Sequence, residues 1–187
     1  MSGLYDREHV LALLHGYTAG EALRRHAHAV EAAMRAAAAR TGNDPETWGA
    51  AGLLHDFDYE RWPDIPDHAN KGAEILRERG YPEEFVRTIL SHASYTGVPR
   101  ETVRAQWLFA VDELCGFCMA CAMVQPDRKI AAVKVESVKK KLKKKDFAAK
   151  VNREEIAEGA AALGLEVEEV IAHVLTALVG ISGELGL

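Results

Sequence analysis

Apolar residues recur at helical spacing along almost the whole chain, and this periodicity limits the possible folds more than any other feature. One face of the segment after Thr18 collects residues three or four positions apart: Leu23, His26, Val30 and Ala33. Such residues are neighbours on one side of a helix. Runs that alternate apolar β-branched and polar residues, as strands do, are nearly absent. The pattern therefore predicts an all-α fold.

Cap and turn residues divide this pattern into about eight or nine helices. Asp44 and Pro45 illustrate the reasoning, because Asp favours the N-cap and Pro the first helical position. The stretch 57–67, with Pro63 and Pro66, is predicted to be a loop. The expected helices cover residues 6–16, 19–42, 45–55, 67–79, 82–93, 100–124, 134–145, a segment after Asn152, and 166–182.

The two central histidines of the segment after Thr18 are predicted to point in opposite directions. His26 lies on the apolar face, whereas His28 shares the opposite face with Glu31 and Arg35. We therefore expect His26 to point inward. We expect His28 and Glu31 to face solvent.

Further ionisable residues are predicted on inward faces. His92 follows apolar residues at helical spacing, Asp112 falls in the apolar stripe of the 100–124 helix, and His68 lies in the first turn of the 67–79 helix. His55 and Asp56 stand together where the apolar run GLLHDFDYE leaves its helix. Buried carboxylates are costly unless they are paired or bound to a metal. Imidazoles and carboxylates that meet would suit zinc, iron or manganese.

Each of these residues also has an ordinary structural explanation when it is taken alone. A single inward histidine such as His92 is more often a hydrogen-bonded core residue than a metal ligand. Asp112 could pair with Arg104 or Arg128. The metal interpretation therefore rests on the whole set of inward residues.

The order His26, His55-Asp56 and Asp112 on an all-α chain resembles the HD-domain superfamily of metal-dependent phosphohydrolases. Segments LRRHAHAVEAAMR, WGAAGLLHDFDYE, HANKGAEIL and DELCGF look like its successive motif helices and cover residues 20–120. The remainder, with SVKKKLKKKDFAAKVNREEI, resembles a branch of compact bacterial predicted HD hydrolases with no assigned substrate. The resemblance implies an HD-type helical bundle in one domain over 1–187, with a core at 18–125 and a C-terminal helical extension at 126–187.

The resemblance also implies a set of metal ligands. The family's minimal set matches four positions of this chain: His26, His55, Asp56 and Asp112. Members with two metals add two histidines between the HD pair and the last Asp, and His68 and His92 occupy that interval. One or two divalent ions (Mn, Fe, Mg, Zn or Co) would then be the cofactor, with Asp56 as the bridge if two ions bind.

Asp56, Asp58 and Glu60 are the candidate catalytic carboxylates. The family's single-metal nucleotidases often carry a Glu three residues after the HD Asp, but position 59 here is Tyr. That assignment does not transfer, and Asp58 and Glu60 are nearby substitutes. The alternative for both is a solvated carboxylate in a loop.

A run of lysines forms a concentrated basic segment. The segment 139–145 holds six of the 23 basic residues of the chain and none of its 28 acidic residues. Substrate phosphate is one partner for this charge, and the candidate contacts are Lys140, Lys141, Lys144 and Arg153. A solvated helix is the alternative. Nucleic acid is disfavoured, because no aromatic residues are interleaved with the lysines and the rest of the chain is acidic.

The three cysteines favour a reducing compartment, and the hydropathy pattern predicts neither a secretion signal nor a membrane span. Cys115, Cys118 and Cys121 form C-x2-C-x2-C without a fourth ligand, so we interpret them as small core residues rather than as an iron–sulfur site. Three cysteines cannot all be paired, and MSGLYDREHV lacks the pattern of a secretion signal. We expect a cytoplasmic protein without a membrane span.

The function predicted from these features is hydrolysis of a phosphate mono- or diester by a metal-activated water. The partner would be a small phosphorylated molecule, with nucleotides among the candidates. Two alternatives stay open. Some HD proteins with six ligands hold two irons and oxidise a substrate with O2, and a non-catalytic module would use the metal and the lysines to bind a nucleotide. The sequence does not indicate the oligomeric state.

Overall fold

The computed structural model describes residues 3–187, and all regular elements in that range are helical, as the periodicity predicts. Ten α-helices are present, nine of them with seven residues or more. They are α1 (Arg7–Tyr17), α2 (Glu21–Thr41), α3 (Pro45–Leu54), α4 (Asp67–Glu78), α5 (Glu83–His92), α6 (Val103–Met123), α7 (Val135–Leu142), α8 (Arg153–Ala162), α9 (Val167–Gly180) and α10 (Ser182–Leu185). Two 3-10 turns, η1 (Ser94–Thr96) and η2 (Ile130–Ala132), complete the list.

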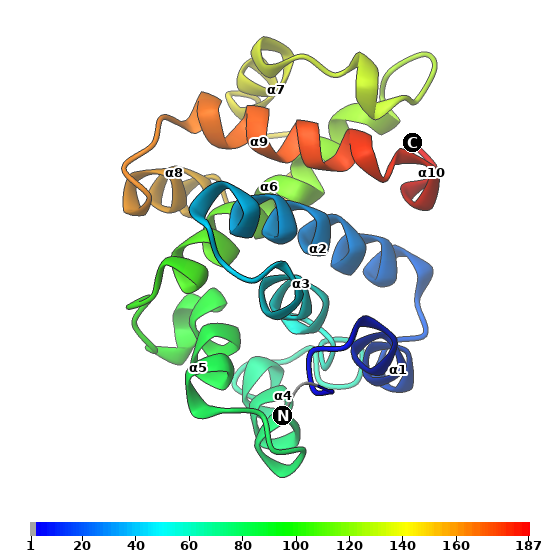
Figure 1. Ribbon diagram of the computed structural model, residues 1–187. Coiled ribbons are helices and arrows are strands. Elements are labelled where there is room, and N and C mark those ends of the chain that lie inside the picture. The colour runs from blue at the N-terminus through cyan, green and yellow to red at the C-terminus, as the bar shows by residue number, and fades with distance from the viewer. Residues whose placement is uncertain (1–2) are drawn as a thin grey trace.

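Helix α2 lies at the centre of the molecule. It packs against α3, α6 and α9, and Figure 1 shows it between α9 on one side and α3 on the other. The approach of α3 depends on Gly52, since a Cβ at this position would lie only 2.7 Å from the Cα atom of Glu31. This close contact brings the end of α3, with His55 and Asp56, next to α2.

The helix boundaries confirm the predictions that rest on local caps. The side chains of Asp44 and Asn152 accept backbone N–H groups at the starts of α3 and α8. Asp6 caps α1 in the same way. Gly42 ends α2 in the left-handed conformation that favours glycine.

The basic helix is shorter than predicted. Helix α7 ends at Leu142, so Lys143–Lys145 lie in the connection that follows. The guanidinium of Arg153 donates hydrogen bonds to the carbonyl oxygens of Leu142 (3.2 Å), Lys144 (3.1 Å) and Val151 (2.8 Å). These bonds stabilise a turn in place of another helical turn. The expected 166–182 helix is α9, which ends at Gly180, and the short α10 follows it.

Helix α6 forms much of the core. By length and composition it could cross a membrane, but most of its apolar window is buried and it packs against α2, α8 and α9. Its cysteines Cys115, Cys118 and Cys121 are buried free thiols. Burial raises the pKa of the first two well above the usual value. The helix is therefore the centre of a bundle that the C-terminal helices help to cover.

The expectation that Glu31 faces solvent is wrong. Glu31 is 4% exposed, and its carboxylate pairs with Arg7 at 2.7 Å and Arg35 at 2.9 Å. Burial would raise the pKa of Glu31, but hydrogen bonds from His28, Arg7 and Arg35 lower it to about 2. Helix α3 packs over Glu31 at Gly52, and Arg7 of α1 adds the ion pair that balances the buried charge.

Candidate metal centre

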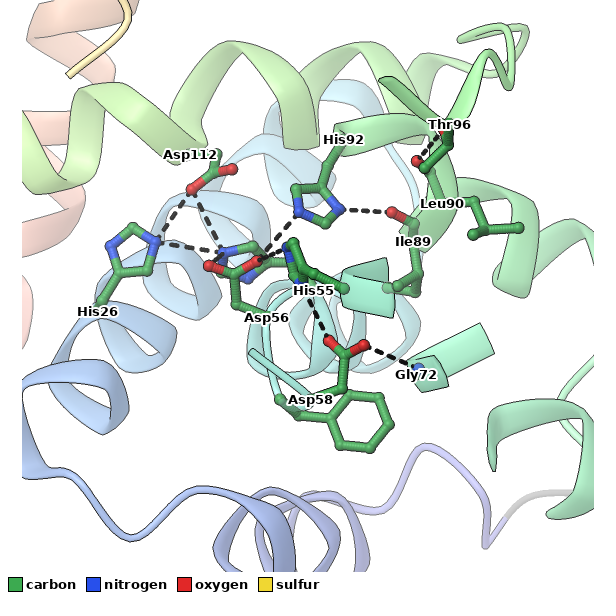
Figure 2. A network of polar contacts seen from close by, with 12 residues as sticks. His26, His55, Asp56, Asp58, Gly72, Ile89, Leu90, His92, Thr96 and Asp112 are labelled. Atoms are coloured by element: carbon green, nitrogen blue, oxygen red, sulfur yellow. Dashed lines mark hydrogen bonds and ion pairs between the residues drawn. The ribbon is translucent and has the colours of Figure 1, made fainter. Parts of the chain in front are cut away.

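Six ionisable residues from five segments converge at one place. His26 comes from α2, His55 and Asp56 from the end of α3, and the others from α4, the end of α5 and the middle of α6. They form two groups of three, within each of which the candidate ligand atoms lie no more than 4.8 Å apart: His26, His55 and Asp112, and Asp56, His68 and His92. Figure 2 shows the first group and Asp56 pointing toward one another. The structure thus brings together all six candidate ligands named above.

The first group places hydrogen-bond acceptors against one another. His55 is fully buried, and its Nδ1 atom lies 2.8 Å from the carbonyl oxygen of Gly52, which it reaches as a donor. The Nε2 atom of the neutral ring then carries a lone pair. It faces Asp112 Oδ1 at 3.3 Å and His26 Nε2 at 3.2 Å. These atoms repel unless a proton or a metal ion lies between them, and the group therefore fits a cation.

The second group has the same design. Asp56 Oδ1 lies 3.1 Å from the Nε2 atoms of both His68 and His92. His92 donates from Nδ1 to the Ile89 carbonyl at 2.6 Å, and His68 Nδ1 lies 3.1 Å from Asp58 Oδ1. Such partners on the second ring nitrogen orient metal-binding histidines. Their presence on both histidines supports the fit of an ion here.

Asp56 lies between the two groups. Its Oδ1 atom belongs to the second group, while Oδ2 is 3.6 Å from His55 Nε2 in the first. Asp112 contacts His26 at 3.0 Å and does not use the arginine partners considered from the sequence; Arg104 pairs with Glu84 at 3.0 Å. Of the two carboxylates, Asp56 is thus the one whose oxygens face both groups.

The carboxylates make the centre attractive to positive charge. Burial would lower the pKa of His55, but Asp56 and Asp112 raise it to about 10. Burial also opposes protonation of His68, yet Asp56 and Asp58 raise its pKa to about 9. The same contacts lower the pKa of Asp56 and Asp112, against the opposite effect of burial. A divalent ion would take the place of these protons.

A solvent-accessible cavity of about 340 Å³ opens over both groups. Its wall includes Tyr59, Ser94, Tyr95, Glu113 and Glu155. Burial and the neighbouring carboxylate of Asp112 raise the pKa of Glu113 to about 7. In residues 3–187, no lysine or arginine lines this cavity. A ligand that reaches the metal centre would therefore meet aromatic and acidic side chains.

The two loop carboxylates lie in different surroundings. Asp58 is fully buried and accepts a hydrogen bond from the backbone N–H of Gly72 at 2.8 Å in addition to its contact with His68. The alternative of a solvated carboxylate therefore does not describe it. Glu60 accepts the backbone N–H groups of Ala19 (2.7 Å) and Gly20 (2.9 Å) and does not line the cavity.

The candidate substrate-binding cations lie away from this wall. Lys141 contacts Ser137 Oγ at 3.1 Å, Lys139 pairs with Glu168, and Arg153 is occupied by backbone carbonyls. Lys140, Lys141, Lys144 and Arg153 are not among the residues that line the cavity. An electrostatic effect of the lysines on a ligand would have to act from a distance.

The acidic wall of the cavity was not predicted from the sequence. Glu155 comes from α8, and only tertiary packing brings it to the cavity. One signal for the opening was present: Gly116 stands four residues after Asp112, on the same side of α6, and leaves space beside the carboxylate.

Comparison with known families adds one result. The profile of the HD domain matches residues 23–115, the range that contains all six candidate ligands. No curated protein and no solved structure matches the chain.

Proposed function

The chain belongs to the HD-domain family through residues 23–115, and from this premise we propose that it is a metal-dependent phosphohydrolase. The observation that carries the proposal is the presence of two His/Asp groups at the base of an open cavity. Asp56 of the second group also faces His55 of the first. Two neighbouring cation sites beside a cavity suit the attack of water on a phosphate ester.

Each residue of the centre has a definite part in this reaction. Divalent ions held there would supply Lewis acidity and bring the pKa of a water molecule toward neutrality. His26, His55 and Asp112 would hold one ion, and His68 and His92 the other, with Asp56 between them. The backbone carbonyls of Gly52 and Ile89 keep His55 and His92 in the tautomer that presents Nε2.

The cavity wall narrows the substrate class. A nucleoside di- or triphosphate carries negative charge beyond the reacting phosphate, and this charge would meet Glu113 and Glu155 without a lysine or arginine in the lining of the described cavity. Like charges in a confined site cost binding energy. We therefore expect a phosphate ester of an uncharged or hydrogen-bond-donating alcohol to be preferred over polyphosphates.

A substrate panel tests the proposal. The metal-free protein is loaded with Mn2+, Mg2+, Co2+ or Zn2+ and offered nucleoside and sugar monophosphates, amino-alcohol phosphates, a phosphodiester and a nucleoside triphosphate. We expect turnover of at least one ester, its loss in Asp56→Ala together with weaker metal binding, and its retention in His28→Ala.

The same panel separates the alternatives. Absence of turnover on every ester with both ions bound would contradict hydrolysis. Iron in the purified protein together with O2 consumption would favour an oxygenase. Tight nucleotide binding without turnover would favour a binding module.

A further inference from the structure

The backbone conformation at His68 differs from that of the candidate ligands on regular helices. His26 and Asp112 lie inside regular helices, and His55 keeps helical dihedral angles at the end of α3 (φ −61°, ψ −40°). His68 has ψ 147°, and the next residue, Ala69, has φ 59°. This is a correction to the expectation that His68 lies in a regular first turn of α4. A positive φ is unfavourable for a residue with a Cβ atom, so surrounding contacts must hold this break.

Asp58 makes two of these contacts with one buried carboxylate. Its Oδ1 atom is 3.1 Å from His68 Nδ1, and Oδ2 accepts the backbone N–H of Gly72 at 2.8 Å. Gly72 lies in the first regular turn of α4 after the break, where N–H groups lack partners inside the helix. Asp58 thus caps the regular part of α4 and orients His68 at the same time.

Gly72 and Tyr95 complete the set of contacts that hold His68. A Cβ atom at Gly72 would lie 3.0 Å from Asp58 Cγ and 3.0 Å from Cε1 of Phe57, so any side chain at position 72 would press on the carboxylate and on the buried ring. On the other side, the Tyr95 hydroxyl donates to the carbonyl oxygen of His68 at 3.1 Å. Ring and backbone of His68 are therefore fixed by separate contacts.

We propose that Asp58 is a positioning residue that aims His68 Nε2 at the second ion, and that this ion alone depends on the Asp58 contact. When Asp58 accepts the Nδ1 proton, the lone pair of His68 is on Nε2, toward Asp56. The ligands of the first group use the Gly52 carbonyl and each other, and Asp58 is not among their hydrogen-bond partners. The inference rests on the two-ion centre of the proposed function but not on its reaction.

Asp58→Asn is the direct test, because it keeps the size of the side chain and removes its ability to accept two hydrogen bonds. If the amide nitrogen faces Gly72, two N–H donors oppose each other. If it faces His68, Nδ1 becomes the acceptor and the proton moves to Nε2, which then cannot bind metal. Loss of such a partner typically weakens metal binding 10- to 100-fold. We expect this loss for the second Mn2+ only, measured by equilibrium dialysis or calorimetry.

Glu60→Gln is the matched control. It removes a carboxylate two residues away in the same loop, where the contacts are the backbone of Ala19 and Gly20. We expect it to bind both Mn2+ ions as the native protein does. A thermal melt of each metal-free variant, with its affinity for the first ion, shows whether the fold is intact.

Two further variants disturb the contacts that hold His68 while residue 58 remains Asp. Gly72→Ala places a methyl group against the Asp58 carboxylate and the Phe57 ring, and it should weaken the second ion more than the first. Tyr95→Phe removes one hydrogen bond to the His68 backbone and should weaken the second ion about fivefold.

Several results would overturn the inference. One is native affinity for both ions in Asp58→Asn, and another is equal weakening of both ions in a folded Asp58→Asn variant. If Asp58→Asn does not fold, native second-ion affinity in Gly72→Ala overturns it, whereas selective loss supports it. A native protein that binds fewer than two ions also overturns it. Two bound ions without any turnover would instead contradict only the hydrolase proposal.

Discussion

Metal binding at this centre should release protons in a pH-dependent way. Burial opposes protonation of both rings, but Asp56 and Asp112 raise the pKa of His55 to about 10, and Asp56 and Asp58 raise that of His68 to about 9. After chelation, both rings therefore carry an extra proton at pH 7.5. A metal ion needs the lone pair that this proton occupies, so loading both groups should release about two protons.

The magnitude for metal affinity follows from these pKa values. An ion that displaces one proton loses about tenfold in apparent affinity for each pH unit below the pKa of the imidazole. Between pH 9 and pH 7, the apparent affinity of each group should therefore fall about 100-fold. Because His68 has the lower pKa, the second group should reach its full affinity at a lower pH than the first.

The free energy of unfolding of the metal-free protein should fall as pH rises, whereas the affinity for metal rises. The folded state holds the His55 proton more tightly than the unfolded state, in which the pKa is 6.5. The resulting stabilisation is fully present below about pH 6.5 and disappears as pH rises through about 9 to 10. A shift of this size corresponds to at most about 5 kcal/mol in the free energy of unfolding. The metal-loaded protein should keep its stability, because the ion replaces the proton.

Two measurements check this reasoning. Calorimetric titration with Mn2+ in buffers of different ionisation enthalpy gives the number of protons released. Thermal melting of chelated and loaded protein from pH 6.5 to 10 gives the stability. Ion binding at pH 7.5 without proton release would refute the argument, as would a chelated protein whose melting temperature is constant over that range. His28→Ala should leave the proton count unchanged, since His28 faces Glu31.

Three further variants probe other contacts. His92→Ala should weaken the second ion much more than the first in a metal titration, because His92 Nε2 faces Asp56 at 3.1 Å, whereas its contact with the first group is limited to ring packing against His55. Glutamine should replace three lysines together: Lys140, Lys141 and Lys144. Since these residues lie outside the cavity lining, we expect unchanged metal content and only a slight change in KM, seen only at low salt. Glu31→Gln should cost about 2 kcal/mol in urea unfolding at pH 7, and the difference from native should vanish as pH falls from about 4.5 through about 2, where native Glu31 loses its charge. Equal stability of the two proteins at pH 7 would show that the Arg7 and Arg35 pairs contribute nothing.

The parts of the fold that depend on local interactions could be predicted from the sequence. Asp44-Pro45 and Asn152 identified helix starts because a cap acts on N–H groups two or three residues away. Gly42 identified a helix end for a similar reason, since its left-handed conformation closes the last turn. These features need no knowledge of how the helices pack.

The errors concern residues whose partners lie far along the chain. Glu31 has the spacing of a solvent-facing residue, but α3 packs over it at Gly52 and Arg7, 24 positions earlier, pairs with its carboxylate. His68 has the spacing of a helical residue, but Asp58 and Tyr95 hold it at a break. Periodicity reports the face of a helix, and it contains no information about what covers that face.

The candidate site likewise has features that follow from local spacing and features that follow only from helix packing. Helical phasing named His26, His92 and Asp112, which occupy inward positions of regular helices, and the family resemblance named the full set of six candidate ligands. Their separation into two groups depends on the close packing of α2 and α3 at Gly52, which spacing does not encode. The acidic wall depends on the placement of α8 against α6 and was equally inaccessible.

The charge of the centre explains why its cavity needs no lysine or arginine. Two divalent ions held by the two carboxylates Asp56 and Asp112 and by neutral imidazoles would leave a net positive charge at the base of the cavity. The buried carboxylate of Asp58 beside His68 would reduce this charge further, and the anionic oxygens of the reacting phosphate, in a monoester or a diester, would offset what remains. Any further anionic group would lie against Glu113 and Glu155. For the proposed hydrolysis, the carboxylate wall would therefore limit the negative charge of the substrate to the reacting phosphate, and a mono- or diester of an uncharged alcohol would meet this limit equally well.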